Sequence, residues 1–190
     1  MEYGIFCDST KDYNLYKDIG ADDFGKKIAE AVLNKKINSN SEIEQAKVQL
    51  YDNNATDAQL WKIIHNSDGT IGLMNKACGL MLDVEGGSVS SGALVRVYKA
   101  NGSKAQKFKL KQYDGYVPSF VAPVMIVPYV NETLRVECAG GGKENGTRIQ
   151  TFTNNSSSAQ KWTVIDNGDG HWRLINTGSM KALDVSGGGV

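Results

Sequence analysis

The sequence predicts an all-β fold built from three copies of one unit, with a short segment of different character in front of them. A Gln-x-aromatic tripeptide occurs at residues 59–61, 106–108 and 160–162, each time directly after an alanine. In each copy another aromatic residue stands eight positions before the glutamine, and an asparagine stands five before it. Short alternating stretches recur between turn-forming clusters without helical spacing, which is typical of strands. Self-similarity at this period of about 40 to 55 residues indicates a repeat architecture.

Each unit is expected to open with a strand of the pattern apolar–acid–apolar. Residues 82–84 (Leu-Asp-Val) and 136–138 (Val-Glu-Cys) fit this pattern, and each acid lies 23 residues before its glutamine. The first unit lacks such a strand at residues 35–37, whereas Leu-Asp-Val recurs at residues 183–185 with no unit after it. We therefore expect the C-terminal strand to complete the first unit, as in a circularly permuted chain. The alternative is that residues 181–190 begin a truncated fourth copy.

The spacing of the units also predicts one inserted loop. The acids at positions 83 and 137 are 54 residues apart, whereas those at 137 and 184 are 47 apart. The additional residues follow Phe108, and residues 116–129 contain all three prolines of the chain. We interpret residues 116–129 as the loop.

Several residues are assigned to the core rather than to a binding site. The aromatic side chain of each tripeptide supplies apolar area, and the glutamine amide can satisfy backbone groups of the neighbouring turn. The apolar residues expected to face the same core are Leu82, Val84, Val95, Val97, Val136, Ile149, Leu183 and Val185.

The three in-register copies resemble the ricin-B-type β-trefoil lectins over residues 37–190. The resemblance is carried by the Gln-x-Trp tripeptides, the Leu-Asp-Val strands and the aromatic residues at matching offsets. It implies a β-trefoil in which each unit holds a shallow sugar pocket made of an acid, an aromatic residue and an asparagine. These groups suit a sugar, because a carboxylate accepts hydrogen bonds from hydroxyls, an amide both donates and accepts, and an aromatic ring covers the apolar sugar face.

Carried over to this sequence, the resemblance implies three sugar-binding sites. Their residues are Asp184, Tyr51 and Asn54 for site one, Asp83, Tyr98 and Asn101 for site two, and Glu137, Phe152 and Asn155 for site three. Site three departs from the pattern, because glutamate is one methylene longer than aspartate and phenylalanine lacks a hydroxyl. The alternative for all three sites is that the acids and asparagines only cap turns.

Residues 1–36 have a different character and are expected to form a strand and two helices. Residues 3–7 are a short apolar run, Ser9 and Asp12 fit a helix start, and residues 21–35 place apolar side chains at helical spacing. Residues 2–8, 12–16 and the alanine-rich helix resemble the C-terminal end of the zinc-dependent N-acetylmuramoyl-L-alanine amidases of clostridial autolysins and phage endolysins.

This second resemblance aligns Glu2 with the catalytic glutamate of the amidases. The zinc ligands that the family places far upstream have no counterpart here, and the two histidines, His65 and His171, fall within the repeats. Without a metal or a positioned water, a glutamate lacks the partners for general-base chemistry. We expect no catalysis by this chain alone and no cofactor, with zinc only where a missing amidase portion is supplied.

Composition excludes some partners and bears on location. Lysine plus arginine and aspartate plus glutamate number 21 each, so the basic excess of a nucleic-acid binder is lacking. No apolar run reaches the roughly 20 residues of a membrane span, and the N-terminus does not read as a signal peptide. The odd number of cysteines, three, favours synthesis in a reducing compartment. We expect a protein made in the cytoplasm that acts at the bacterial cell wall.

Three functions remain open at this point. The first is carbohydrate binding that targets a cell-wall hydrolase to bacterial cell-wall glycans, with residues 1–36 as the remnant of the amidase domain and residues 37–190 as the binding domain. The second is an amidase completed by a partner or by upstream sequence. The third is a β-trefoil scaffold that binds proteins. Residues 1–36 would form the contact surface for self-association or for docking on the full-length amidase.

Overall fold

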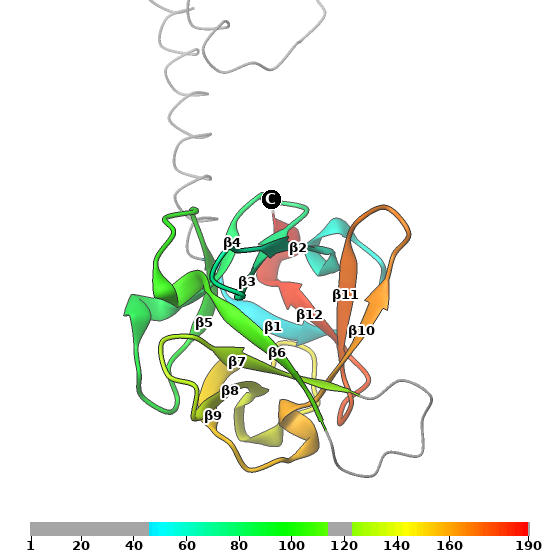
Figure 1. Cartoon of the computed structure of the whole chain (residues 1–190). Helices are drawn as coiled ribbons and strands as arrows, with labels where there is room; N and C mark the ends of the chain where they lie inside the picture. Colours follow the sequence, from blue (N-terminus) through cyan, green and yellow to red (C-terminus); the bar gives the residue numbers. More distant parts are fainter. Residues whose placement is uncertain (1–45, 114–122, 190) are drawn as a thin grey trace, which may run out of the picture. The chain divides into compact units, whose positions relative to one another are not determined.

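The computed structural model describes residues 46–113 and 123–189. The strand and helices expected within residues 1–36, and Glu2 with them, lie outside these residues. The described part contains twelve strands and six short 3-10 helices (Figure 1). The strands are β1 Val48–Tyr51, β2 Trp61–His65, β3 Ile71–Asn75, β4 Met81–Val84, β5 Val95–Tyr98, β6 Phe108–Gln112, β7 Val124–Pro128, β8 Leu134–Cys138, β9 Ile149–Thr153, β10 Trp162–Asp166, β11 Trp172–Asn176 and β12 Ala182–Val185. The 3-10 helices are η1 Asp57–Gln59, η2 Glu85–Gly87, η3 Lys104–Gln106, η4 Ala139–Gly141, η5 Ser158–Gln160 and η6 Ser186–Gly189.

Three antiparallel hairpins, β2–β3, β6–β7 and β10–β11, join into a closed barrel. Each hairpin begins with the aromatic residue of a Gln-x-aromatic tripeptide, and that residue pairs with a neighbouring hairpin. The joining pairs are Trp61 with Trp172, Phe108 with Ile71 and Trp162 with Val124. The three tripeptides therefore mark the three seams of the barrel.

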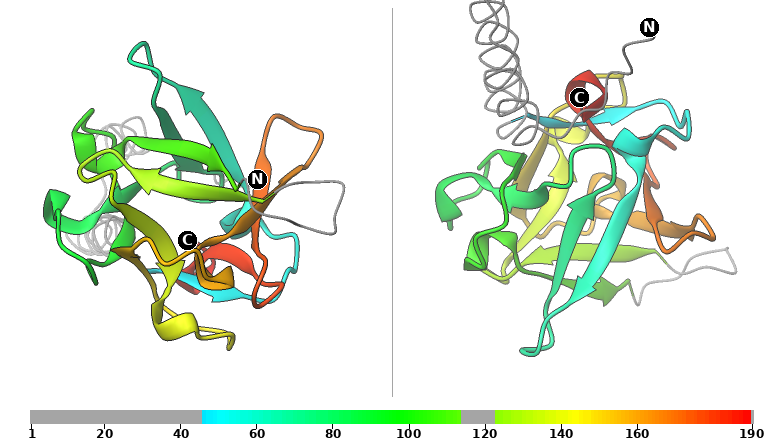
Figure 2. Two further views of the ribbon diagram at one scale, coloured as in Figure 1. Left: turned by 60° about the horizontal axis from the view of Figure 1, so that its bottom comes forward. Right: turned by 90° about the horizontal axis from the view of Figure 1, so that it is seen from above.

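Three further hairpins, β12–β1, β4–β5 and β8–β9, pack against the barrel (Figure 2). They meet one another through single antiparallel bridges, which are Lys47 with Arg96, Gln49 with Arg148 and Leu94 with Gln150. One barrel hairpin and one packed hairpin together form one unit, and the three units are equivalent. The predicted all-β, three-unit β-trefoil is confirmed.

The C-terminal strand completes the first unit, as the unit spacing predicts. Strand β12 pairs with β1 in the register Val48 with Val185 to Tyr51 with Ala182, and the two lie side by side in Figure 1. The backbone N–H of Ser186 extends this pairing by donating to the Lys47 carbonyl at 2.9 Å. The alternative, in which these residues begin a fourth copy, is wrong.

The core is continuous between the barrel and the packed hairpins. Trp61, Phe108 and Trp162 are fully buried, and all eight apolar residues assigned to the core belong to the same buried cluster. Burying an indole leaves its N–H in need of an acceptor. The Trp61 indole donates to the Leu183 carbonyl at 3.0 Å, and that of Trp162 donates to the Val136 carbonyl at 3.2 Å.

The prediction of a loop over residues 116–129 is wrong in its second half, because β7 occupies Val124–Pro128. This strand pairs with β6 along its length, and Met125, Ile126 and Val127 are buried. Proline lacks a backbone donor, which strands tolerate at their ends but not in their middle. Pro128 is the last residue of β7, and Pro123 precedes the strand, where its carbonyl accepts the Tyr113 N–H at 2.8 Å.

Candidate functional site

Each packed hairpin holds one of the three predicted acids in its first strand. Asp83, Glu137 and Asp184 are only 3%, 4% and 5% exposed. A buried carboxylate is costly unless it is hydrogen-bonded. In every unit one carboxylate oxygen accepts from the glutamine of the tripeptide, with Nε2–O distances of 3.2 Å for Gln106 to Asp83, 3.0 Å for Gln160 to Glu137 and 3.2 Å for Gln59 to Asp184.

The same glutamines hold the other two members of each site in place. Their Nε2 atoms also donate to the carbonyl of the residue after the aromatic, namely Asp52, Lys99 and Thr153, at 2.8 to 2.9 Å. Their Oε1 atoms accept from the backbone N–H of Asn54, Asn101 and Asn155 at 3.0 to 3.1 Å. The predicted structural role of the glutamines is confirmed. Each glutamine side chain thus forms hydrogen bonds with the acid, with the backbone after the aromatic residue and with the backbone of the asparagine.

A residue that the sequence reasoning missed binds the second oxygen of each acid. It lies directly opposite the acid on the paired strand. Gln49 donates to Asp184 at 2.9 Å, Gln150 donates to Glu137 at 3.0 Å, and Arg96 Nε donates to Asp83 at 3.2 Å. Each stands two positions before the aromatic residue, and strand alternation places such pairs on one face. That fixed offset was the available signal.

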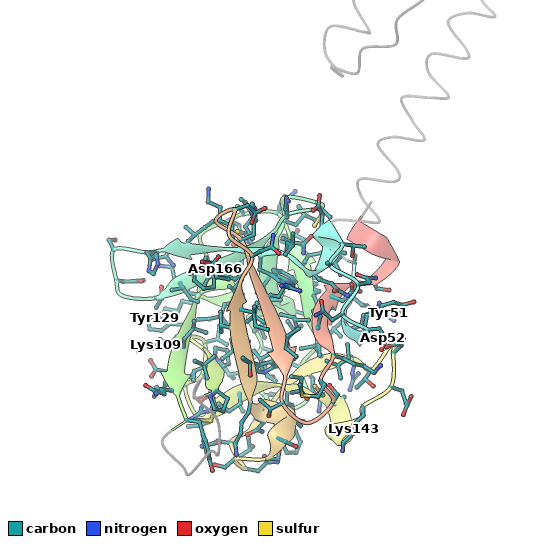
Figure 3. All side chains as sticks on the ribbon, turned by 90° about the vertical axis from the view of Figure 1, so that its right-hand side faces the viewer. Tyr51, Asp52, Lys109, Tyr129, Lys143 and Asp166 are labelled. Atoms are coloured by element: carbon teal, nitrogen blue, oxygen red, sulfur yellow. The ribbon has the colours of Figure 1, made fainter. Side chains whose placement is uncertain are left out.

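The predicted aromatic residues differ in exposure. Tyr51 and Phe152 are 39% and 38% exposed, whereas Tyr98 is half-buried. Figure 3 shows Tyr51 at the molecular surface beside Asp52. An exposed ring on a rigid strand offers a flat apolar face to solvent.

The three asparagines cap turns with their side-chain oxygens. Oδ1 of Asn54, Asn101 and Asn155 accepts the backbone N–H two residues further along, at 3.1, 2.9 and 3.0 Å. The alternative that the asparagines cap turns is therefore correct for their side-chain oxygens. All three side chains are exposed, and their amide nitrogens have no partner within the described part of the chain. Each asparagine therefore keeps two N–H donors toward solvent.

The members of site two line one surface depression of about 610 Å³. Asp83, Tyr98 and Asn101 share its wall with Arg96, Lys104 and Val130. The structure thus brings together the three predicted members of site two, which lie up to 18 positions apart in the sequence (83 to 101).

The chemistry available at these sites is hydrogen bonding and stacking. A carboxylate has about four lone-pair positions, and two are used by protein donors in each unit, so about two remain. Burial raises the pKa of Asp184, although the bonds from Gln49 and Gln59 act in the opposite direction. Among residues 46–113 and 123–189, no group of three His, Cys, Asp or Glu side chains is placed to hold a metal ion. No helix in the same residues is long and apolar enough to span a membrane.

A closed barrel with three packed hairpins, each carrying an equivalent acid–aromatic–asparagine site, defines a lectin-type β-trefoil. The chain belongs to the family described as "Ricin-type beta-trefoil lectin domain-like", whose model matches residues 28–98 and 105–190. Membership of this lectin-like family indicates that the domain binds carbohydrate. Among curated proteins none matches the chain.

Several solved structures share the fold. A designed three-fold symmetric protein, ThreeFoil, has a TM-score of 0.54 and 24% identity, over 68% of this chain and 81% of that one. A mosquitocidal holotoxin has a TM-score of 0.55 and 15% identity, over 70% and 22%. The exo-beta-1,3-galactanase 1,3Gal43A of Clostridium thermocellum has a TM-score of 0.50 and 21% identity, over 72% and 29%. This chain thus spans less than a third of the last two proteins, and at these identities the likeness concerns the fold alone.

Proposed function

We propose that this chain is a carbohydrate-binding module that holds a cell-wall hydrolase on bacterial cell-wall glycans. The observation that carries the proposal is the buried carboxylate of each unit, which lies on the same hairpin face as an aromatic ring and keeps about two acceptor positions unused. A carboxylate held by two protein donors is fixed in direction before a ligand arrives. Preorganisation of this kind reduces the entropic cost of binding.

The three groups match the surface of a pyranose. The ring of Tyr51 or Phe152 can cover the apolar C–H face, while the acid accepts from two neighbouring hydroxyls. The asparagine amide of the same unit supplies a donor for a sugar oxygen. Contacts this few and this shallow give weak binding at each site, so several sites on a polymeric ligand gain strength by avidity.

The choice of bacterial cell-wall glycan rests on the amidase-like segment. Residues 2–8 and 12–16 resemble the end of an N-acetylmuramoyl-L-alanine amidase, and such an enzyme acts on peptidoglycan. In the proposed protein the amidase portion cleaves, Glu2 belongs to that portion, and the trefoil holds the enzyme on its substrate. A zinc ion would enter with the upstream residues that the family uses as ligands.

A glycan array on the purified chain, including cell-wall fragments, tests the proposal. We expect binding to neutral or N-acetylated cell-wall sugars, and its loss in the triple variant Tyr51→Ala, Tyr98→Ala, Phe152→Ala with the far-UV circular dichroism retained. Binding that survives the triple variant would place the sugar elsewhere. Failure to bind any glycan would favour the protein-interaction scaffold. Stoichiometric zinc together with released muropeptides would instead identify an active amidase.

A further inference from the structure

The three sites differ at the residue opposite the acid. Sites one and three have Gln49 and Gln150 there, whereas site two has Arg96. The Arg96 guanidinium donates through Nε to Asp83 at 3.2 Å and through Nη1 to Glu85 at 3.3 Å. Its central carbon also lies 4.6 Å from the centre of the Tyr98 ring. One side chain thus contacts both the acid and the aromatic residue of site two.

The guanidinium lies over the face of the Tyr98 ring on which a sugar would stack, and its charge is paired with the acid of the same site. The side chains of Arg96 and Asp83 are 15% and 4% exposed, so water and salt screen their attraction less than at a fully exposed ion pair. A cation over an aromatic face is a further favourable contact. A neutral sugar that stacks on Tyr98 has to displace the guanidinium from the ring, and this movement disturbs its ion pair with Asp83.

Sites one and three carry no such competitor. The glutamines there are neutral and shorter, and each donates to its acid without forming an ion pair. At site three the Arg148 guanidinium donates to Gln150 Oε1 at 2.8 Å, that is, to the glutamine and not to the acid. No cation lies over the ring of Tyr51 or Phe152 in the described part of the chain, and both rings are more than a third exposed. A sugar can stack there without breaking an ion pair.

We propose that Arg96 is a specificity-determining residue that keeps neutral sugars from stacking on Tyr98 in the depression of site two, which it lines, so that the module binds them through sites one and three. This inference rests on the proposed function and deepens it. Arg96 is not an anion receptor in this state, because Asp83 and Glu85 already neutralise its charge. The trefoil thereby has two sites that bind neutral sugars and a third in which the Arg96 side chain takes the place of the sugar.

A reciprocal exchange of the two residue types tests the proposal on the whole chain. Arg96→Gln gives site two the donor that the other sites have, and Gln49→Arg gives site one the guanidinium. The probe is a neutral sugar chosen from the array, titrated by NMR with the side-chain amide signals of Asn54, Asn101 and Asn155 reporting each site separately. We expect Arg96→Gln to strengthen binding at site two at least tenfold, and Gln49→Arg to weaken binding at site one by a similar factor.

The outcomes separate this inference from the proposed function. If no signal moves in any of the three proteins, the proposed function fails. If the native protein binds sugar at site two as tightly as Arg96→Gln does, sugar binding stands and the role of Arg96 is refuted. A thermal melt checks that each variant folds. If Arg96→Gln does not fold, Gln49→Arg decides alone, and unchanged affinity at site one overturns the inference.

Discussion

At the scale of single residues, we expect Asp184 to make sugar binding at site one sensitive to pH. Burial raises the pKa of Asp184, so its carboxylate is protonated at a higher pH than an ordinary aspartate of about 3.9. A protonated carboxyl group loses acceptor capacity toward sugar hydroxyls. We expect affinity at site one to fall as the pH approaches this raised pKa, as measured by titration at a series of pH values.

The sign of the linkage distinguishes this loss from unfolding. Because the folded state holds the Asp184 proton more tightly than the unfolded chain does, protonation of this group favours the folded state. As the pH falls, sugar binding should therefore weaken while protonation of Asp184 adds to the stability of the folded state. Asp184→Asn is the control, and its affinity should be low and flat with pH. Binding by the native protein that stays constant down to pH 4 would contradict the assignment.

Tyr51 and Trp61 provide a matched pair of aromatic residues, one exposed and one buried. Tyr51 is 39% exposed and Trp61 is fully buried. We expect Tyr51→Ala to abolish binding at site one with a stability loss below about 1 kcal/mol, because an exposed ring leaves no cavity. Trp61→Ala should cost about 3–5 kcal/mol by cavity formation. Urea unfolding of both variants measures the loss in the free energy of unfolding. A loss in Tyr51→Ala as large as that in Trp61→Ala would make Tyr51 a core residue.

The two described cysteines should react at different rates. Cys138 is fully buried in the core, and burial, with a smaller contribution from Glu137, raises the pKa of its thiol to about 12. Cys78 is half-buried, and burial raises the pKa of its thiol too. Since the thiolate is the reactive form, Cys138 should remain unmodified by iodoacetamide at pH 8 in the folded protein and react in urea. Peptide mapping by mass spectrometry locates the label, and modification of native Cys138 at the rate of Cys78 would refute its burial.

At the scale of elements, β12 is the part whose removal should damage the fold most selectively. Deleting residues 181–190 removes the partner of β1, the acceptor of the Trp61 indole N–H at Leu183, and the acid of site one. Buried groups left without partners cost roughly 1–3 kcal/mol each. We expect a markedly lower Tm and loss of sugar binding at site one.

A shorter deletion, of residues 187–190, is the control for this experiment. It leaves β12 and the bond from the Ser186 N–H to the Lys47 carbonyl intact, so it should lower the Tm much less than the longer deletion does. Equal Tm values for the native protein and the deletion of residues 181–190 would show that the pairing of β1 with β12 does not support the fold.

The elements were predictable where the repeat constrained them. The aromatic residues and two of the acids could be placed because they recur at the same distances from the glutamine, and the closing strand because it repeats the Leu-Asp-Val pattern that the first copy lacks. A misplaced residue would not have matched these distances. Strand β7 was missed because its flanking prolines resemble a loop, although proline at the end of a strand leaves the pairing intact. Arg96 was missed for another reason. Its offset of two residues before Tyr98 is visible in the sequence, but its contact with Asp83 depends on the cross-strand register of β4 and β5, which that offset alone does not specify.

At the scale of the whole molecule, the three-fold arrangement holds the sites apart on separate hairpins. Tyr51 belongs to β1 and Phe152 to β9, which are strands of two different packed hairpins. The two exposed rings are thus carried by different units. We therefore expect the domain to engage two sugars of one polymer or two neighbouring polymer chains.

Multivalent binding by the two sites can be measured by sedimentation of the protein with purified cell walls. Linked weak sites exceed the single-site affinity by a factor on the order of 10² to 10⁴. Tyr51→Ala and Phe152→Ala should therefore each reduce retention on cell walls at least tenfold, far beyond the halving expected of independent sites, and the double variant should not be retained. Tyr98→Ala is the matched control, because Arg96 already occupies site two, and it should be retained nearly as well as the native protein. Single variants that lose only half of the retention would show that the sites act independently on the wall.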